Sequence, residues 1–242
     1  MIALLMRLRP FLPQDVWQRM RDAYWRCYWR REEKAEARAL SGAPRSRIAG
    51  SERAVLAEAI ADSYPFSSLL EVGCAYGQNF YTCAAQFPHS RFTGVDLDAE
   101  KVKEGQALLL RRGLGNVVLE EGDAADLSRY AARSFDLVIS CACLLFCGPA
   151  AVEHVLAEMI RVSAKKVLLL EQHEERTMQS GSLAGSCRER AGGGTYWVWD
   201  YGALLKPLVG GEQISITKVP APRWDMESWR STGALIEVRL NG

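Results

Sequence analysis

Short apolar runs alternate with amphipathic stretches along the chain from Ser51 onwards. The apolar runs predict five successive strands, at 68–72, 91–96, 116–121, 135–141 and 165–172. Stretches with helical spacing predict helices before and between them, at 52–64, up to about Phe87, at 99–113 and at 149–163. Continuous apolar runs such as LVIS and VLLL are typical of strands buried on both faces. This alternation predicts a parallel sheet that is covered by helices on both sides.

The C-terminal part of the chain breaks this alternation. Residues 174–195 are polar and glycine-rich and predict a long loop, while TYWVWDYGALLKPL (195–208) predicts a helix. Two further apolar runs, at 214–219 and 234–240, predict an antiparallel pair, because the segment between them has no helical pattern. The fold expected is therefore α/β, with a doubly wound, mostly parallel seven-stranded sheet and an antiparallel C-terminal hairpin.

The first fifty residues differ from the rest in composition and predict a separate helical extension. Residues 1–53 hold twelve Lys or Arg against six Asp or Glu, interspersed with Trp and Tyr, whereas the whole chain has a net charge of +1. We expect a basic, aromatic-rich extension at 1–50 and one main domain at 51–242. The favoured interpretation is an accessory helix that packs on the domain or forms a dimer contact. A helix lying on an anionic membrane surface is the alternative, followed by nucleic-acid binding.

Composition sets the expected compartment and excludes some classes of protein. The apolar fraction of 48% is typical of a globular protein and argues against a disordered or fibrous chain. No apolar run is long enough to predict a transmembrane helix, and the start of the chain lacks the cleavage pattern of a secretory signal. Seven cysteines, several of them in apolar strands, are interpreted as reduced thiols. We therefore expect a cytoplasmic protein without a nucleic-acid partner, and the sequence leaves its oligomeric state open.

The most informative stretch is LLEVGCAYGQNF, at 69–80. A strand runs through Glu71 into a turn that contains Gly73 and Gly77, and a helix follows. Glycine lets a backbone turn sharply and approach a ligand, and a helix N-terminus favours anionic groups. Asp96 ends the next strand, where a carboxylate can accept hydrogen bonds from both hydroxyls of a ribose. The spacing G-C-A-Y-G does not match the dinucleotide-binding pattern G-x-G-x-x-G.

Three segments in order, E-V-G-x-x-x-G, G-V-D-L-D and E-G-D-A, resemble the class I S-adenosylmethionine (SAM)-dependent methyltransferases over about residues 65–175. The resemblance implies that SAM is the cofactor. It assigns the methionine part of SAM to Glu71, Gly73, Cys74, Ala75, Tyr76 and Gly77. It assigns the ribose and the adenine to Asp96, Leu97, Asp123 and Ala124, and places Cys141 near the sulfonium. Ala75 departs from the family, which usually has a glycine at that position.

The methyl acceptor is less defined, and we expect a small polar molecule or a glycan that is methylated at oxygen. A hydroxyl acceptor benefits from a base, and the candidates at the end of the fifth strand are Glu171 and His173. A loose similarity to small-molecule methyltransferases of bacterial surface-sugar biosynthesis implies an acceptor site walled by Tyr196, Trp197, Trp199, Asp200 and Tyr201. Core packing is the other interpretation of these aromatic side chains.

Several alternatives remain open at this point. The acceptor motif N-P-P-Y of amino-methylating nucleic-acid enzymes is missing, which argues against methylation of nucleic-acid bases. Methylation of nitrogen, sulfur or a protein remains an alternative, as does a non-catalytic partner subunit that keeps the fold. Cys141, Cys143 and Cys147 lack the spacing of a zinc site and are interpreted as buried small residues, so no metal is expected.

Overall fold

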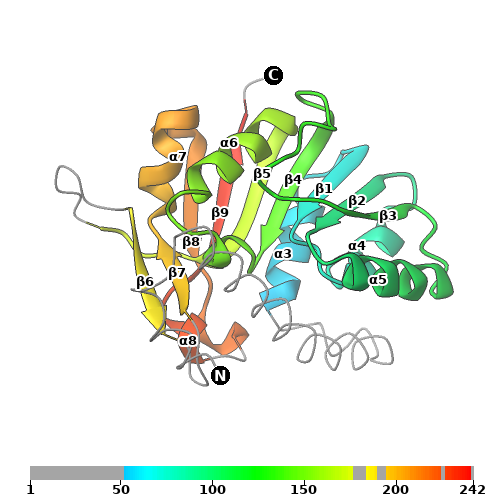
Figure 1. Cartoon of the computed structure of the whole chain (residues 1–242), viewed down its shortest axis with the longest axis horizontal. Helices are drawn as coiled ribbons and strands as arrows, with labels where there is room; N and C mark the ends of the chain where they lie inside the picture. Colours follow the sequence, from blue (N-terminus) through cyan, green and yellow to red (C-terminus); the bar gives the residue numbers. More distant parts are fainter. Residues whose placement is uncertain (1–51, 177–183, 190–194, 225–226, 241–242) are drawn as a thin grey trace, which may run out of the picture.

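The computed structural model describes residues 52–176, 184–189, 195–224 and 227–240 (Figure 1). The predicted N-terminal extension at 1–50 lies outside the described residues, as does Ser51. The division into an extension and one domain therefore remains a prediction. No helix in the described ranges combines the length and the apolar character needed to cross a membrane.

A seven-stranded sheet forms the centre of the molecule, in the order β3-β2-β1-β4-β5-β9-β8. The first five strands are parallel, and β9 pairs antiparallel with both β5 and β8. The prediction of a mostly parallel sheet with an antiparallel C-terminal hairpin is confirmed. The bounds are β1 (Ser68–Val72), β2 (Arg91–Asp96), β3 (Val117–Glu121), β4 (Phe135–Cys141), β5 (Ser163–Gln172), β8 (Ile214–Lys218) and β9 (Gly233–Arg239).

Helices cover both faces of this sheet (Figure 1). Side chains alternate across a strand, so Leu69 of β1 packs into one hydrophobic cluster and Leu70 into the other. Leu56, Phe80 and Leu109 contribute helical side chains to the first cluster, and α6 and α7 contribute to the second. The bounds are α3 (Glu52–Ala61), α4 (Phe80–Gln86), α5 (Ala99–Arg111), α6 (Val152–Val162) and α7 (Tyr201–Val209).

The structure corrects the prediction for the segment between β5 and α7. The expected loop contains β6 (Gly185–Glu189), and the first part of the expected helix is β7 (Thr195–Trp199), which pairs with β6. The alternation of TYWVW suits a strand, because Tyr196 joins one hydrophobic cluster while Trp197 and Trp199 stack on each other. The helix starts only after Asp200, whose Oδ1 accepts a hydrogen bond from the Ala203 amide as an N-cap.

Two smaller differences concern helix content. The segment between β8 and β9, expected without a helix, holds two short ones, η5 (Ala221–Arg223) and α8 (Glu227–Arg230). Helix α6 begins at Val152, three residues after the proline that was expected to open it. Neither difference changes the order of the sheet.

The strand order reverses direction between β1 and β4, because the chain runs outward to β2 and β3 and then returns to β4. Ligands of open α/β sheets bind outside the carboxyl ends of the strands at such a switch point. The segments at this position are the turn after β1 and the short helix η3 (Leu144–Phe146) after β4.

Candidate active site

The turn after β1 is held against β2 by backbone hydrogen bonds. The amides of Gly73 and Cys74 both donate to the carbonyl of Val95, at 2.8 and 3.1 Å. Gly73 and Gly77 have φ angles of 74° and 71°, in the left-handed region that favours glycine. A Cβ at Gly73 would also overlap with the side chain of Cys143, which follows β4. The two loops at the switch point are therefore in contact.

Ala75 and Asp96 connect this turn to the end of β2. The Asp96 Oδ2 accepts the Ala75 amide at 2.8 Å, and its Oδ1 accepts the Asp98 amide at 2.9 Å. A carboxylate oxygen has two lone pairs, so both oxygens of Asp96 retain acceptor capacity for a ligand. Ala75 has a φ of 48°, and this left-handed conformation explains why glycine is the usual residue at this position.

Glu71 lies under the same turn with its side chain buried, at 1% exposure. Its Oε1 accepts a hydrogen bond from Asn79 Nδ2 at 2.5 Å, and the Asn79 Oδ1 in turn accepts one from Arg53 at 2.8 Å. Burial raises the pKa of Glu71 to about 8, and the hydrogen bond from Asn79 and the charge of Arg53 oppose this rise. The Glu71 Oε2 is buried and has no hydrogen-bond partner among the described residues. This carboxyl group can therefore receive a donor from a ligand.

Glu171, near the end of β5, fixes the loop after β4. Its Oε1 accepts hydrogen bonds from Ser140 Oγ at 2.8 Å and from the amides of Cys143 and Leu144 at 2.9 and 3.0 Å. Burial raises the pKa of Glu171 to about 7, against the lowering effect of these donors. The other oxygen, Oε2, is buried and has no hydrogen-bond partner in the part of the chain that the structure describes. The arrangement makes Glu171 the support of the loop that contains Cys143.

His173 follows β5 and contacts the start of α7. Its Nδ1 accepts the amide of Tyr201 at 3.2 Å, so the neutral ring carries its proton on Nε2 in this arrangement. Tyr201 is fully buried, and none of the described residues forms a hydrogen bond with its hydroxyl. Trp199 is also buried and donates from Nε1 to the carbonyl of Leu144 at 3.2 Å. The sheet of β6 and β7 is thereby tied to η3.

These contacts can be compared with known proteins. The family model described as a methyltransferase domain matches residues 69–166, which include the turn after β1, the end of β2 and the loop after β4. Residues 69–166 of this chain are thus similar to a methyltransferase domain. The seven-stranded sheet with the antiparallel β9 is the fold of class I methyltransferases.

The individual proteins that resemble this chain are distant relatives. The chain is 28% identical to the ajmaline N-methyltransferase of Rauvolfia serpentina over 152 residues, which are 58% of this chain and 51% of the relative. The chain thus spans about half the length of this curated relative.

Two solved structures have the same fold. A 1,6-didemethyltoxoflavin-N1-methyltransferase of Burkholderia thailandensis, crystallised with its substrate and S-adenosylhomocysteine, has a TM-score of 0.62 and 17% identity and covers 96% of this chain and 91% of its own. The N-terminal domain of EvdMO1, crystallised in the presence of SAH and D-fucose, has a TM-score of 0.59 and 18% identity and covers 78% of this chain and 83% of its own.

The fold brings most of the expected cofactor residues to the carboxyl ends of the strands. Leu97 is about half exposed next to Asp96, which suits a side chain that covers a ring. Asp123 is exposed just after β3 and accepts the Ala125 amide at 2.8 Å, with Ala124 partly buried beside it. Cys141 is the last residue of β4 and is partly buried.

Other expected site residues are buried in the core. Cys74 and Tyr76 are 3% and 1% exposed, so only their backbones are available at the turn. Of the five residues expected to wall an acceptor site, only Trp197 is partly exposed. The side chains of the other four are buried, namely Tyr196, Trp199, Asp200 and Tyr201.

Sequence patterns did not indicate Asn79 and Arg53, although both are linked to Glu71. Asn79 is part of the glycine-rich segment, so its proximity to Glu71 was available as a signal. Arg53 carries no such signal, because it reaches the turn from a helix 26 residues earlier in the chain. Ser140 and its bond to Glu171 were also missed.

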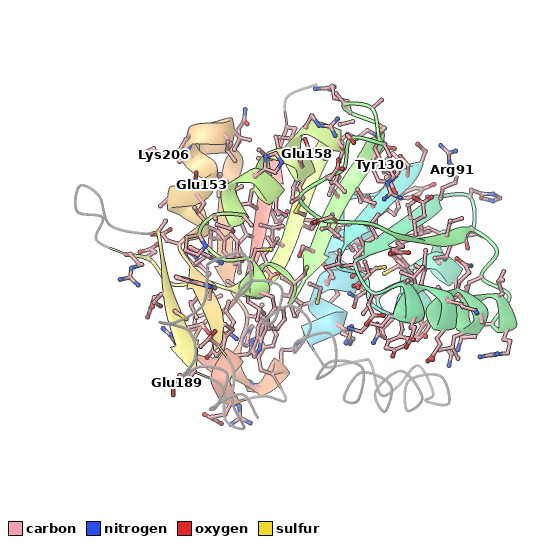
Figure 2. The ribbon with its side chains drawn as sticks, in the orientation of Figure 1. Arg91, Tyr130, Glu153, Glu158, Glu189 and Lys206 are labelled. Carbon is pink, nitrogen blue, oxygen red and sulfur yellow. The ribbon has the colours of Figure 1, made fainter. Side chains whose placement is uncertain are left out.

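Further polar contacts fix the segment between β3 and β4. Glu158 forms an ion pair with Arg161 at 2.6 Å, and the Tyr130 hydroxyl donates to Glu120 at 2.5 Å. Glu158 also accepts the Leu127 amide, and Arg161 donates to the carbonyl of Tyr130. Figure 2 labels Tyr130 and Glu158, and also Arg91, which is the first residue of β2 and lies at the amino ends of the strands.

Proposed function

We propose that this protein transfers the methyl group of SAM to an oxygen of a small polar molecule or a glycan. The observation that carries the proposal is the pair of carboxylates, Glu71 and Asp96, on either side of one glycine-rich turn at the switch point. A ligand with an ammonium group and a ribose diol matches this pair. The buried Glu71 Oε2 without a partner and the spare lone pairs of Asp96 support the fit.

The proposal assigns a role to each cofactor residue. Asp96 would accept the two ribose hydroxyls, and Leu97 would pack on the adenine. Asp123 and Ala124 would contact the amino group and the edge of the adenine ring, and Cys141 would lie near the sulfonium. The backbone of residues 73–77 would face the methionine part.

SAM supplies a methyl group bound to a positively charged sulfur, which a nucleophile attacks in line. The chain's contribution is to hold the nucleophile in position and to exclude water. Glu171 supports the loop after β4 through three hydrogen bonds on one oxygen, which favours a precise position for Cys141 and Cys143 beside the cofactor. We propose that the loop orders the reacting groups.

His173 is the proposed base for an oxygen acceptor. The Nδ1 atom of His173 accepts a hydrogen bond from the Tyr201 amide, so the proton of the neutral ring is on Nε2. Nε2 can take a proton from the acceptor oxygen only after the ring proton has moved to Nδ1 and the hydrogen bond from Tyr201 has broken. Until then the ring orients an acceptor oxygen by donating from Nε2. Glu171 was also predicted as a base, and its Oε2, buried without a hydrogen-bond partner, is the atom that would take the proton.

Calorimetry with S-adenosylhomocysteine tests the cofactor assignment. The wild-type protein is expected to bind the compound, and Asp96→Ala is expected to reduce affinity by at least about tenfold, the equivalent of one charge-assisted hydrogen bond. Asp62→Ala is the matched control, since Asp62 is an exposed acid after α3 and its replacement is expected to leave affinity unchanged. Equal affinity in the wild type and Asp96→Ala would refute the assignment.

The acceptor requires a separate experiment. Incubating the protein with labelled SAM and a fractionated cell extract, followed by identification of the labelled product, determines the acceptor and the methylated atom. A methyl group on nitrogen would favour the second candidate, an N-methyltransferase like the Rauvolfia relative. Binding without turnover in any fraction would favour a non-catalytic subunit.

A further inference from the structure

A chain of two hydrogen bonds connects α3 to the buried carboxylate of the glycine-rich turn. Arg53 Nη1 donates to Asn79 Oδ1 at 2.8 Å, and Asn79 Nδ2 donates to Glu71 Oε1 at 2.5 Å. The amide orientation follows from the charges, because its carbonyl faces the guanidinium and its NH₂ group faces the carboxylate. The polarised amide therefore extends the influence of Arg53 to Glu71.

Glu71 occupies an environment that disfavours its charge. It is 1% exposed, and within the described ranges its Oε2 has no hydrogen-bond partner. Asp96, at the end of β2, adds a second negative charge that opposes ionisation, while Arg53 and Asn79 favour it. The thiols of Cys74 and Cys143 also lie within electrostatic reach of Glu71. A buried carboxylate in this position gains a large stabilisation from an added cation.

We propose that Arg53 and Asn79 are positioning residues that orient Glu71 toward the ammonium group of a bound ligand, and that binding of this group releases one proton from Glu71. This inference rests on the proposed function, since the ammonium belongs to the methionine part of SAM. The proton leaves the Glu71 carboxyl group for the solvent, and the resulting carboxylate pairs with the ammonium.

The direction of the pH effect follows from the free protein. The pKa of Glu71 is about 8, so the carboxyl group is mostly protonated at pH 7 before the ligand arrives. An adjacent ammonium lowers this pKa, and binding therefore becomes tighter as the pH rises toward 8. The expected slope approaches about tenfold in affinity per pH unit when one proton is released. A ligand without the ammonium group should show neither effect.

Two ligands separate this coupling from general binding at the site. S-adenosylhomocysteine carries the amino-acid tail, whereas 5′-methylthioadenosine has the same nucleoside and no ammonium. For the wild-type protein, calorimetry at pH 7 in buffers of different ionisation enthalpy is expected to give about one proton released per S-adenosylhomocysteine and about none per 5′-methylthioadenosine. Equal proton release with both ligands, or none with either, would overturn the inference without any variant.

Variants of the two positioning residues sharpen the test. Asn79→Leu and Arg53→Met are expected to weaken S-adenosylhomocysteine by about tenfold and to leave the affinity for 5′-methylthioadenosine unchanged. Arg53→Lys retains the positive charge, so its affinity for S-adenosylhomocysteine is expected to fall less than that of Arg53→Met. Arg91→Met is the control, because Arg91 lies at the opposite end of the sheet (Figure 2).

The possible failures are distinguishable. In one outcome, the Asn79 and Arg53 variants bind both ligands with equally reduced affinity while their thermal unfolding is unchanged. In that case these residues support the whole turn, and the inference is wrong. If the wild-type protein binds neither ligand, the cofactor assignment itself fails. If a variant does not fold, the proton count on the wild-type protein still decides the outcome.

Discussion

The side chain of Cys143 occupies the place that a Cβ of Gly73 would take. This contact joins the turn after β1 to the loop after β4, the two segments at the switch point of the sheet. Glu171 holds the second loop from behind through the amides of Cys143 and Leu144. The position of the turn after β1 and the position of the loop after β4 therefore depend on each other.

Gly73→Ala should destabilise the protein because it combines a left-handed φ with a steric overlap. We expect a loss of about 2–4 kcal/mol in the free energy of unfolding, measured by urea denaturation. Gly113→Ala provides a control for the backbone term alone, since Gly113 has a φ of 75° and open space around it. Gly115→Ala, at an open site, should change stability by less than about 0.5 kcal/mol. Equal losses of stability in Gly73→Ala and Gly113→Ala would show that the Cys143 side chain moves aside without destabilising the protein.

Ala75→Gly should stabilise the protein. Ala75 has a φ of 48°, a conformation that glycine adopts without strain. Relief of this strain stabilises the folded protein, and the greater conformational entropy of glycine in the unfolded chain offsets part of the gain. We expect the free energy of unfolding to rise by about 0.5–1 kcal/mol. Urea denaturation of the two proteins measures the difference. A loss of stability in Ala75→Gly would contradict the strain at this position.

Glu171→Gln should change the pH dependence of stability. The pKa of Glu171 is raised from 4.5 to about 7, so its contribution to stability declines as the pH rises from 4.5 to 7. Glutamine keeps an oxygen acceptor and cannot ionise. The stability of Glu171→Gln relative to the wild type is therefore expected to increase from pH 5 to pH 8, as measured by denaturation at each pH.

Glu171→Ala is the contrasting variant. It removes the acceptor for one hydroxyl and two backbone amides, and we expect a loss of about 3 kcal/mol or more at all pH values. A stability difference between Glu171→Gln and the wild type that does not vary with pH would show that Glu171 ionises normally.

His173→Ala should lower turnover far more than cofactor affinity, because the proposed role of His173 concerns the acceptor. Loss of general-base or orienting assistance is expected to reduce kcat by about 10²-fold or more. His154→Ala is the matched control, since His154 is exposed on α6. Turnover on the identified acceptor and calorimetry with S-adenosylhomocysteine provide the two measurements. Unchanged turnover in His173→Ala would exclude His173 from the reaction.

Much of the sheet could be predicted because buried parallel strands are continuous apolar runs with clear ends. The bounds of β1, β2 and β4 agree with the prediction to the residue. Strand β7 was mistaken for part of a helix because TYWVW is followed directly by helical sequence, and short aromatic runs fit both periods. The N-cap at Asp200, which separates the two, is evident only from its hydrogen bond to Ala203.

The candidate site could be predicted where it depends on chain order. Glu71 and Asp96 lie near the carboxyl ends of β1 and β2, and Asp123 follows β3. These ends meet at one edge of the parallel sheet, which explains the grouping of the three residues. The link from Arg53 through Asn79 depends on how α3 packs, which no local pattern encodes. The hydrogen bonds of Glu171 to a loop about thirty residues earlier were equally inaccessible to sequence reasoning.

The most direct test of the central assignment is a crystal structure of the protein with S-adenosylhomocysteine at saturating concentration. We predict that the ribose hydroxyls lie within hydrogen-bond distance of the Asp96 carboxylate. The ammonium group is expected to lie on the side of the turn that faces Glu71. A nucleoside bound elsewhere, or a turn at 73–77 that contacts no ligand under these conditions, would contradict the account.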